Sequence, residues 1–365
     1  MGKPPLIRIA PVEFGFGPLG KALHIGRAIR AAAGQSVQIE LCATSSMRLT
    51  VEDGLFDGVV DGLEQPTRAD AVITAMNVAG VRHAARRGER AFVVDSLAWL
   101  WDVPLPVEAV AHRYYYQDLP ILPVPERNLR GLPSPRAIPA IVDESEPRGA
   151  ETRTNSTDLV ISLSGLESPH TRLEDGTLVY PSFVLEGLEC LLELSLVPPE
   201  RVRLFGNERV LRALAGERTL RTIRGTTQRE FLDAASSGSS AVVSPGLTTI
   251  LELIAMGASL RMLPPQNFSQ MKIHRAFTKA GIVGAAWGSE LEPWLADAVI
   301  PEPIGAAITS GLVASRRIAE KHISPERLRS LMLDPAPALT PNQVHELIGP
   351  TNGASILAQH VLAEL

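Results

Sequence analysis

The stretch VVSPGLTTILELIAMGASLRMLPPQN, residues 242–267, reads as an apolar strand, a turn, a helix and a second apolar strand. Ser244 is a typical helix N-cap residue, and Pro245 suits the first helical position, where its missing N–H has no cost. Leu247 and Leu251 recur at helical spacing and predict the face that packs on a sheet. The stretch therefore predicts two parallel strands joined by a helix.

The start of this helix is a candidate anion site. The N–H groups around Gly246–Thr248 would have no partner inside the helix, and the helix dipole adds positive potential there. Thr248 and Glu252, four residues apart, share one face, so Glu252 could accept hydrogen bonds from ribose hydroxyls while the helix start holds a diphosphate. The residues predicted to bind nucleotide here are Ser244, Gly246, Leu247, Thr248, Thr249 and Glu252.

The rest of the chain repeats the strand–helix alternation, which predicts an α/β protein with two Rossmann-like parallel-sheet domains facing a cleft. Ligands in such sheets bind outside the carboxyl ends of the strands, so the cleft is the expected site. A Pro-rich stretch interrupts the alternation. We predict an N-terminal acceptor-side domain (1–125), a linker (126–156), a nucleotide-sugar-binding domain (157–345) and a C-terminal helix (346–365).

These patterns resemble the GT-B glycosyltransferases, particularly the N-acetylglucosaminyltransferase group of peptidoglycan synthesis. In that family a ribose-binding Glu follows a Gly turn by six residues, and a Gly precedes a donor-sugar Gln by nine. Gly246 to Glu252 and Gly257 to Gln266 reproduce both intervals. The segments EFGFGPLGKALHIGRAIRAAAG and DLVISLSG are similar to that family's N-terminal Gly loop and to the opening of its second domain.

The resemblance implies an inverting transferase that uses a UDP-sugar. Ser162, Ser164 and Gly165 would then approach the diphosphate or the base. Gln266 and Asn267 would reach the rim of the donor site. Gln270 could close over the donor. His274, on the same helix face, could also close over the donor, but we expect it to be a surface histidine.

A second likeness is to cytosylglucuronate synthases of nucleoside-antibiotic pathways, through RAFVVDSLAWLWDVP and SPGLTT…LPPQNFSQ. It implies UDP-glucuronate as the donor and a heterocycle such as cytosine as the acceptor, in natural-product biosynthesis. The product would carry an N-glycosidic bond formed with inversion.

The loop FGFGPLGKALHIG, residues 14–26, satisfies G-x-G-x-x-G and almost satisfies a P-loop. A dinucleotide interpretation, that of an NAD(P)-dependent oxidoreductase, would use Glu40 as the ribose-binding acid. The P-loop interpretation lacks the magnesium-binding hydroxyl, because Ala22 takes that position. We expect Gly15 and Gly17 to let main chain approach the donor, and Lys21 either to contact phosphate or a donor carboxylate or to be solvated.

The catalytic base is harder to place, because the first Gly loop lacks the His that many GT-B enzymes carry there. Asp95, after an apolar strand, is one candidate, with a helix N-cap as its alternative role; Glu13 is the other, with a rim carboxylate as its alternative. Trp99 and Trp101 could stack on a planar acceptor. The cluster HRYYYQ, residues 112–117, is expected to be core or interface, with an acceptor platform as its alternative role. No D-x-D motif is present, so no metal is expected.

Composition sets the remaining expectations. The net charge of −5 over 365 residues gives no basic stripe and argues against nucleic acid as a partner. Two cysteines in apolar runs and the lack of a long apolar segment predict a cytoplasmic protein that spans no membrane. We expect a UDP-sugar and a small acceptor as its partners, no cofactor, and a possible homodimer. A catalytically silent GT-B-like auxiliary protein and a UDP-sugar epimerase are further alternatives.

Overall fold

The computed structural model describes residues 2–13, 15–43, 54–100, 106–107, 110–132, 134–143, 158–164, 179–215, 227–236, 240–284, 325–333 and 336–365. The chain forms two compact units. The first contains Met1–Glu146 and His345–Leu365, and the second contains Pro147–Val344.

The first unit is built on a seven-stranded parallel sheet with the order β3-β2-β1-β4-β5-β6-β7. The central strands are buried along their length, as the apolar runs of their sequences predict for a parallel sheet covered on both faces. The strands are β1 (Leu6–Pro11), β2 (Gln38–Cys42), β3 (Gly58–Val60), β4 (Ala71–Ala75), β5 (Arg90–Asp95), β6 (Arg113–Gln117) and β7 (Arg136–Ile138).

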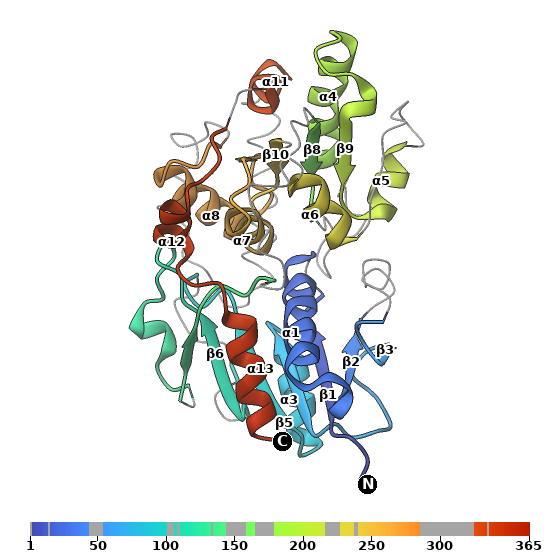
Figure 1. Ribbon diagram of the computed structural model, residues 1–365, viewed down its shortest axis with the longest axis vertical. Coiled ribbons are helices and arrows are strands. Elements are labelled where there is room, and N and C mark those ends of the chain that lie inside the picture. Colours follow the sequence, from blue (N-terminus) through green and yellow to red (C-terminus); the bar gives the residue numbers. More distant parts are fainter. Residues whose placement is uncertain are drawn as a thin grey trace. The chain divides into compact units, whose positions relative to one another are not determined.

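Two helices cover one face of this sheet, α1 (Gly17–Ala33) and the C-terminal α13 (Gly353–Ala363), which lie side by side (Figure 1). Gly34, with φ 56°, ends α1 as the sequence predicts. Helix α13 docks closely, because the Gly353 N–H donates to the Ala140 carbonyl at 3.0 Å. The other elements of the unit are α3 (Val78–Arg86) and the short 3₁₀ turns η1 (Gly34–Ser36) and η2 (Glu126–Leu129).

The predicted Pro-rich linker begins inside the first unit. Both η2 and β7 fall within residues 126–156, and β7 pairs with β6 as the edge strand of the sheet. Residues 144–156 lie outside the described part of the chain. The C-terminal helix, predicted as a separate segment, belongs to the first unit and contributes Leu357 and Val361 to its core.

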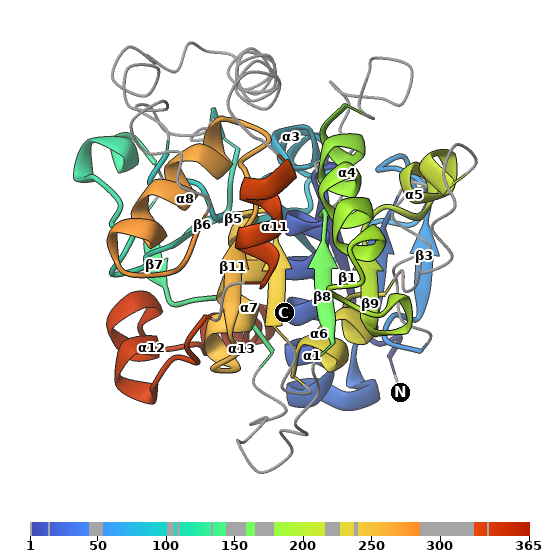
Figure 2. The ribbon, with the colours of Figure 1, turned by 90° about the horizontal axis from the view of Figure 1, so that it is seen from above.

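The second unit contains a four-stranded parallel sheet with the order β11-β10-β8-β9. Helices α4 and α11 pack together over this sheet (Figure 2). The strands are β8 (Leu159–Ser162), β9 (Val202–Phe205), β10 (Ser240–Val243) and β11 (Leu260–Met262). The helices are α4 (Val179–Glu193), α5 (Glu208–Ala215), α6 (Gln228–Ser236), α7 (Leu247–Ala255), α8 (Phe268–Lys279) and α11 (Pro325–Leu333), with the 3₁₀ turn η5 (Pro199–Arg201). Helix α12 (Pro341–Ile348) lies where the chain passes back to the first unit.

Each sheet has one point where the strand order reverses, between β1 and β4 in the first and between β8 and β10 in the second. At such a point the loops that follow the two strands run to opposite faces of the sheet. Ligands bind in the crevice between these loops, at the carboxyl ends of the strands. The strand order therefore marks one candidate position in each unit.

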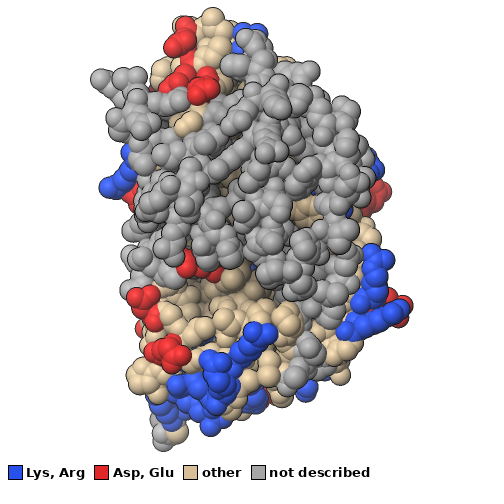
Figure 3. Space-filling view, turned by 180° about the vertical axis from the view of Figure 1, so that it is seen from behind, with Lys and Arg blue, Asp and Glu red and all other residues tan. Residues whose placement is uncertain are grey.

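The charged surface is mixed. Helix α3 carries the exposed Arg82 and Arg86. Figure 3 shows Lys and Arg gathered on one face of the first unit with Asp and Glu beside them. The two cysteines are free; Cys42 is buried and Cys190 is half-buried. Among the described residues, no helix is long and apolar enough to cross a membrane.

Candidate functional site

Helix α7 begins at the reversal point of the second sheet, directly after β10. Its N-cap is Gly246, with φ −76° and ψ 129°, and this glycine has no side chain that could cap the first turn. The predicted N-cap, Ser244, is wrong by two residues. Pro245 likewise precedes the N-cap rather than opening the helix.

The local hydrogen bonds explain this shift. The Gly246 N–H donates to the Ser244 carbonyl at 2.7 Å, which makes a tight turn before the helix and removes Gly246 from the expected anion-binding set. The Ser244 hydroxyl accepts from the Gln266 side chain at 2.8 Å, so it does not cap the helix. The first turn of α7 therefore offers N–H groups from Leu247 onward.

Thr248 and Glu252 are both buried, at 4% exposure, on the helix that Leu251 and Ile254 anchor to the sheet. The Glu252 carboxylate accepts a hydrogen bond from the Gln228 side chain at the start of α6. Sequence reasoning did not find Gln228, because it is 24 residues from Glu252 along the chain and belongs to another helix. A carboxylate can accept about four hydrogen bonds, and Gln228 supplies one of them.

The polar residues after β11 form a hydrogen-bonded cluster. Gln266 donates from its side chain to Ser244, and its backbone N–H donates to the Gln270 side-chain oxygen at 2.8 Å. Asn267 caps α8, because its side-chain oxygen accepts from the Gln270 N–H at 3.0 Å. The structure thus brings together the three residues predicted at the donor rim. Their hydrogen bonds here are to one another and to neighbouring loops.

The loop after β8 lies against the start of α7. Ser164 has φ 64°, a left-handed conformation that non-glycine residues adopt at a cost. Its hydroxyl oxygen is 3.7 Å from the position that a Gly246 Cβ would occupy. The Ser164 N–H points to the Ser162 hydroxyl at 3.4 Å, and Gly165 lies outside the described residues.

His274, one turn beyond Gln270 on α8, is not a surface residue. It is 3% exposed, and burial lowers the pKa of its imidazole to about 4. Its Nδ1 faces the Thr278 hydroxyl at 3.4 Å, and its Nε2 packs against Gly284. His274 is therefore a neutral core histidine.

In the first unit, the glycine loop follows β1 at the other reversal point. Gly15 has φ 55°, which explains why glycine is needed there, and Gly17 opens α1. Glu13 lies on the exposed side of this loop. Lys21 is only 2% exposed, so the expectation of a solvated ammonium is wrong.

Asp95 ends β5 and is 1% exposed. One carboxylate oxygen accepts from the Tyr114 hydroxyl at 2.5 Å and the other from the Leu97 N–H at 2.8 Å. Burial raises the pKa of this carboxyl to about 6, against the lowering effect of both hydrogen bonds. Asp95 thus stabilises the turn that follows β5, where the described residues 96–100 form no helix for it to cap, and Glu13 becomes the preferred candidate for the base.

The aromatic residues are mainly structural. Tyr114 and Tyr115 of β6 are fully buried, as expected for a core cluster. The Trp99 indole N–H donates to the Ser96 carbonyl at 3.1 Å. Trp101 lies outside the described residues.

Glu40 is paired inside the first unit. Its carboxylate accepts from Arg8 at 2.7 Å and 3.1 Å, within the body of the sheet rather than at its carboxyl edge. Arg8 also reaches the Thr67 carbonyl and lies 3.9 Å from Glu89, which precedes β5. This ion pair occupies the acid that a dinucleotide would need, and it weighs against the oxidoreductase interpretation.

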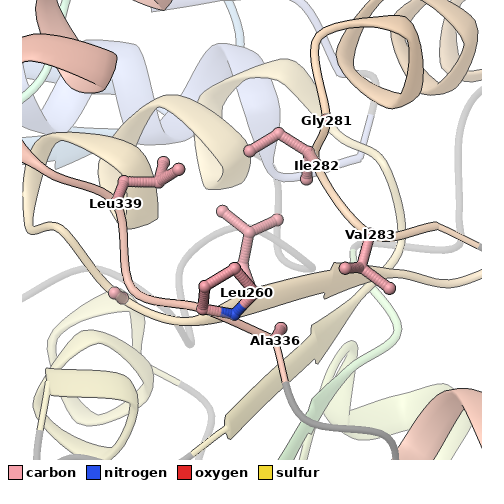
Figure 4. A pocket seen from close by; sticks show the side chains of 8 residues that line it. Leu260, Gly281, Ile282, Val283, Ala336 and Leu339 are labelled. Atoms are coloured by element: carbon pink, nitrogen blue, oxygen red, sulfur yellow. The ribbon is translucent and has the colours of Figure 1, made fainter.

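A small apolar cavity of about 10 Å³ lies beside β11, lined by residues that include Leu260, Ile282 and Leu339 (Figure 4). It adjoins the first residue of β11, at the strand end opposite the start of α7. A cavity of this size has room for about one water molecule, which is far too small for a nucleotide. Within the described residues, no group of three His, Cys, Asp or Glu side chains could hold a metal ion.

Comparison with known proteins shows the fold. No family model and no curated protein matches the chain. The glycotransferase of kitacinnamycin matches with a TM-score of 0.51 at 13% identity, over 100% of both chains. LpCGTa, in complex with UDP, matches with a TM-score of 0.50 at 15% identity, over 99% of both chains. MnaA of S. aureus, in a structure with UDP, matches with a TM-score of 0.50 at 11% identity, over 100% of this chain and 98% of the MnaA chain.

These matches run over the whole chain and agree with the two parallel sheets. They show the GT-B arrangement of two Rossmann-like α/β domains that the sequence predicts.

Proposed function

We propose that this protein is an inverting, metal-independent glycosyltransferase that uses a UDP-sugar. One observation carries the proposal: an α-helix without a side-chain cap, α7, starts at the reversal point between β8 and β10. The general rule for open α/β sheets places a ligand there, and a helix start favours an anion. The UDP in the structures of LpCGTa and MnaA, which share the fold, makes UDP the first ligand to test.

The diphosphate would bind the N–H groups of the first turn of α7, with the Ser164 hydroxyl beside it. The helix dipole and these donors would stabilise the negative charge that develops on the leaving diphosphate. Thr248 and Thr249, in the same turn, supply two further hydroxyl groups.

Glu252 would bind the ribose. It lies five residues after Leu247, about 7 Å along the helix axis from the diphosphate position. Gln228 donates to one oxygen of its carboxylate, which would orient the group for the ribose hydroxyls.

The finer assignment comes from the likeness to cytosylglucuronate synthases: glucuronate as the sugar and cytosine as the acceptor, in a cytoplasmic natural-product pathway. A ring N–H is more acidic than an alcohol, so a carboxylate is a sufficient base. Because Asp95 is buried and hydrogen-bonded, Glu13 on the glycine loop is the proposed base. Lys21, in the second turn of α1 after this loop, is proposed to contact the donor.

The first test is calorimetric titration with UDP, UDP-glucuronate, NADPH and ATP. We expect UDP and UDP-glucuronate to bind and the other two not to bind. Binding of NADPH alone would restore the oxidoreductase interpretation and exclude ours.

Two variants of Gly246 test the position of the diphosphate. Its φ and ψ suit any N-cap residue, and a Cβ there meets only ordinary contacts. Gly246→Asp and Gly246→Asn should each cap the helix without loss of stability. UDP affinity should fall in both, and at least about tenfold further in Gly246→Asp, because its carboxylate repels the diphosphate. UDP binding by Gly246→Asp as tight as by the wild type would refute the site.

Turnover decides between the enzyme and its alternatives. Incubation of UDP-glucuronate with cytosine should release UDP and form an N-glycoside. A new UDP-sugar formed without an acceptor would identify an epimerase. UDP binding with no turnover over a range of sugars and heterocycles would identify a silent auxiliary protein.

A further inference from the structure

Gln266 makes hydrogen bonds that conflict with a direct role at the donor sugar. Its side chain is 7% exposed, and its amide nitrogen lies 3.1 Å from the Leu163 carbonyl and 2.8 Å from the Ser244 hydroxyl. A carbonyl oxygen can only accept, so the atom that faces Leu163 must be the nitrogen. Both hydrogens of the amide are therefore used inside the protein.

These two bonds join three loops at the carboxyl edge of the second sheet. Leu163 follows β8, Ser244 follows β10, and Gln266 itself follows β11. From the other side, the Gln270 side chain of α8 accepts the Gln266 backbone N–H at 2.8 Å. Gln266 is thus fixed at its backbone and at its amide.

The joined loops carry the groups of the candidate diphosphate site. Leu163 immediately precedes Ser164, whose left-handed backbone costs about 1 kcal/mol or more and persists only where neighbouring structure holds it. Ser244 lies two residues before Gly246, the N-cap of α7. Gln266 therefore holds both sides of the reversal point between β8 and β10.

We propose that Gln266 is a positioning residue that sets the spacing between Ser164 and the start of α7, and is not a contact of the donor sugar. This proposal rests on the proposed function and concerns the same site. If it holds, loss of Gln266 weakens the binding of UDP itself, and by the same factor weakens the binding of every UDP-sugar. A sugar contact would instead affect the sugar nucleotide alone.

The test compares Gln266→Met with Gln343→Met. Gln343 is an exposed glutamine whose side-chain oxygen accepts the Thr340 N–H at 2.9 Å, so it controls for loss of a glutamine hydrogen bond elsewhere. We expect Gln266→Met to weaken UDP and UDP-glucuronate about tenfold each, the value of one well-made hydrogen bond. Gln343→Met should leave both affinities unchanged. A substitution that only lowers the free energy of unfolding should likewise leave the affinity of the folded molecules unchanged.

Weaker binding of UDP-glucuronate with unchanged binding of UDP would overturn the proposal and return Gln266 to the sugar subsite. Unchanged binding of both ligands would overturn it as well. Ser244→Ala provides a second route, because it removes one acceptor of the same amide. Ser244→Ala and Gln266→Met should therefore be less than additive in their effect on UDP affinity, and full additivity would contradict the shared bond.

A measurement without ligand separates this proposal from the proposed function. Hydrogen exchange of the backbone amides should accelerate at residues 163–164 and 244–249 in Gln266→Met but not in Gln343→Met. Unchanged exchange would overturn the positioning role. If the wild-type protein binds no UDP, the proposed function fails, and faster exchange at these residues would still support the positioning role.

Discussion

The carboxyl edges of the two sheets share a backbone feature and differ in their side chains. At the β1–β4 reversal point, Gly15 and Met76 have φ 55° and 60°; at the β8–β10 reversal point, Ser164 has φ 64°. Both edges thus have sharp left-handed turns. Buried polar side chains lie at both edges, Thr74, Asp95 and Gln117 in the first unit and Ser244 and Gln266 in the second, where Gln266 hydrogen-bonds to Ser244.

Two sets of buried ionic groups in the first unit have partners inside the protein. Arg8, Glu40 and Glu89 pair with one another away from the carboxyl edge, and Asp95, at that edge, has internal donors for both oxygens. Buried charges that already have partners inside the protein are less available to a ligand. Polar groups arranged around an uncapped helix start are suited to a ligand. Both α1 and α7 begin at a reversal point without a side-chain cap, so the proposal that the second unit binds the nucleotide rests on the polar cluster beside α7. The predictions below test this proposed division between a structural first unit and a nucleotide-binding second unit.

The largest expected effect is on the ion pair of the first unit. Arg8→Met removes the buried partner of Glu40, whereas Glu89 keeps its ion pair with Arg87, and the free energy of unfolding should fall by about 3 kcal/mol. Denaturant unfolding measures it. The UDP affinity of the folded protein should stay unchanged. A loss of UDP affinity, or a destabilisation under about 1 kcal/mol, would contradict a purely structural role for this ion pair.

In the second unit, His274 should make stability fall in acid. Its folded pKa of about 4 is below the ordinary value of 6.5, so the unfolded chain binds the extra proton first as pH falls. The free energy of unfolding therefore falls by roughly 3 kcal/mol as the pH is lowered from 6.5 to about 4. Unfolding of wild type and His274→Phe from pH 7 to pH 4 measures this. Parallel curves for the two proteins would show that His274 is not responsible.

Asp95 in the first unit should act in the opposite direction over an overlapping range. Its folded pKa of about 6 is above the ordinary 3.8, so the folded state binds the proton more tightly. The contribution of Asp95 to the free energy of unfolding is fully present below pH 3.8. It falls by roughly 3 kcal/mol as the pH rises to about 6. Asp95→Asn should flatten this part of the stability profile. A variant that keeps the wild-type slope would contradict the raised pKa.

The smallest effect compares two helix starts. Helix α3 is capped by the Asn77 side chain, which accepts the Gly80 N–H at 2.8 Å. Asn77→Ala should cost about 1 kcal/mol of stability and leave UDP affinity unchanged. Thermal unfolding and titration would check both. If UDP binding fell in Asn77→Ala, the start of α3 would have to be added to the nucleotide site.

The sequence predicts the regular elements well and their tertiary partners poorly. The apolar face of α7 follows the local periodicity of Leu247 and Leu251, as predicted. The start of α7 was misplaced because Ser244 hydrogen-bonds to a residue 22 positions away. Local capping rules contain no information about such a partner.

The same limit explains the other corrections. The sequence around Asp95 fits a catalytic base and a helix N-cap equally well. It does not show that Tyr114, on another strand, donates a hydrogen bond to the Asp95 carboxylate. Lys21 and His274 are polar residues on amphipathic helices, and only packing determines that both are buried. The edge strand β7 has three residues in a Pro-rich stretch, too few to show a period.

A crystal structure with UDP bound tests the central claim most directly. We predict diphosphate oxygens within hydrogen-bonding distance of backbone N–H groups in the first turn of α7, and ribose hydroxyls on the Glu252 carboxylate. A nucleotide bound at the glycine loop of the first unit instead, with the start of α7 unoccupied, would contradict the account.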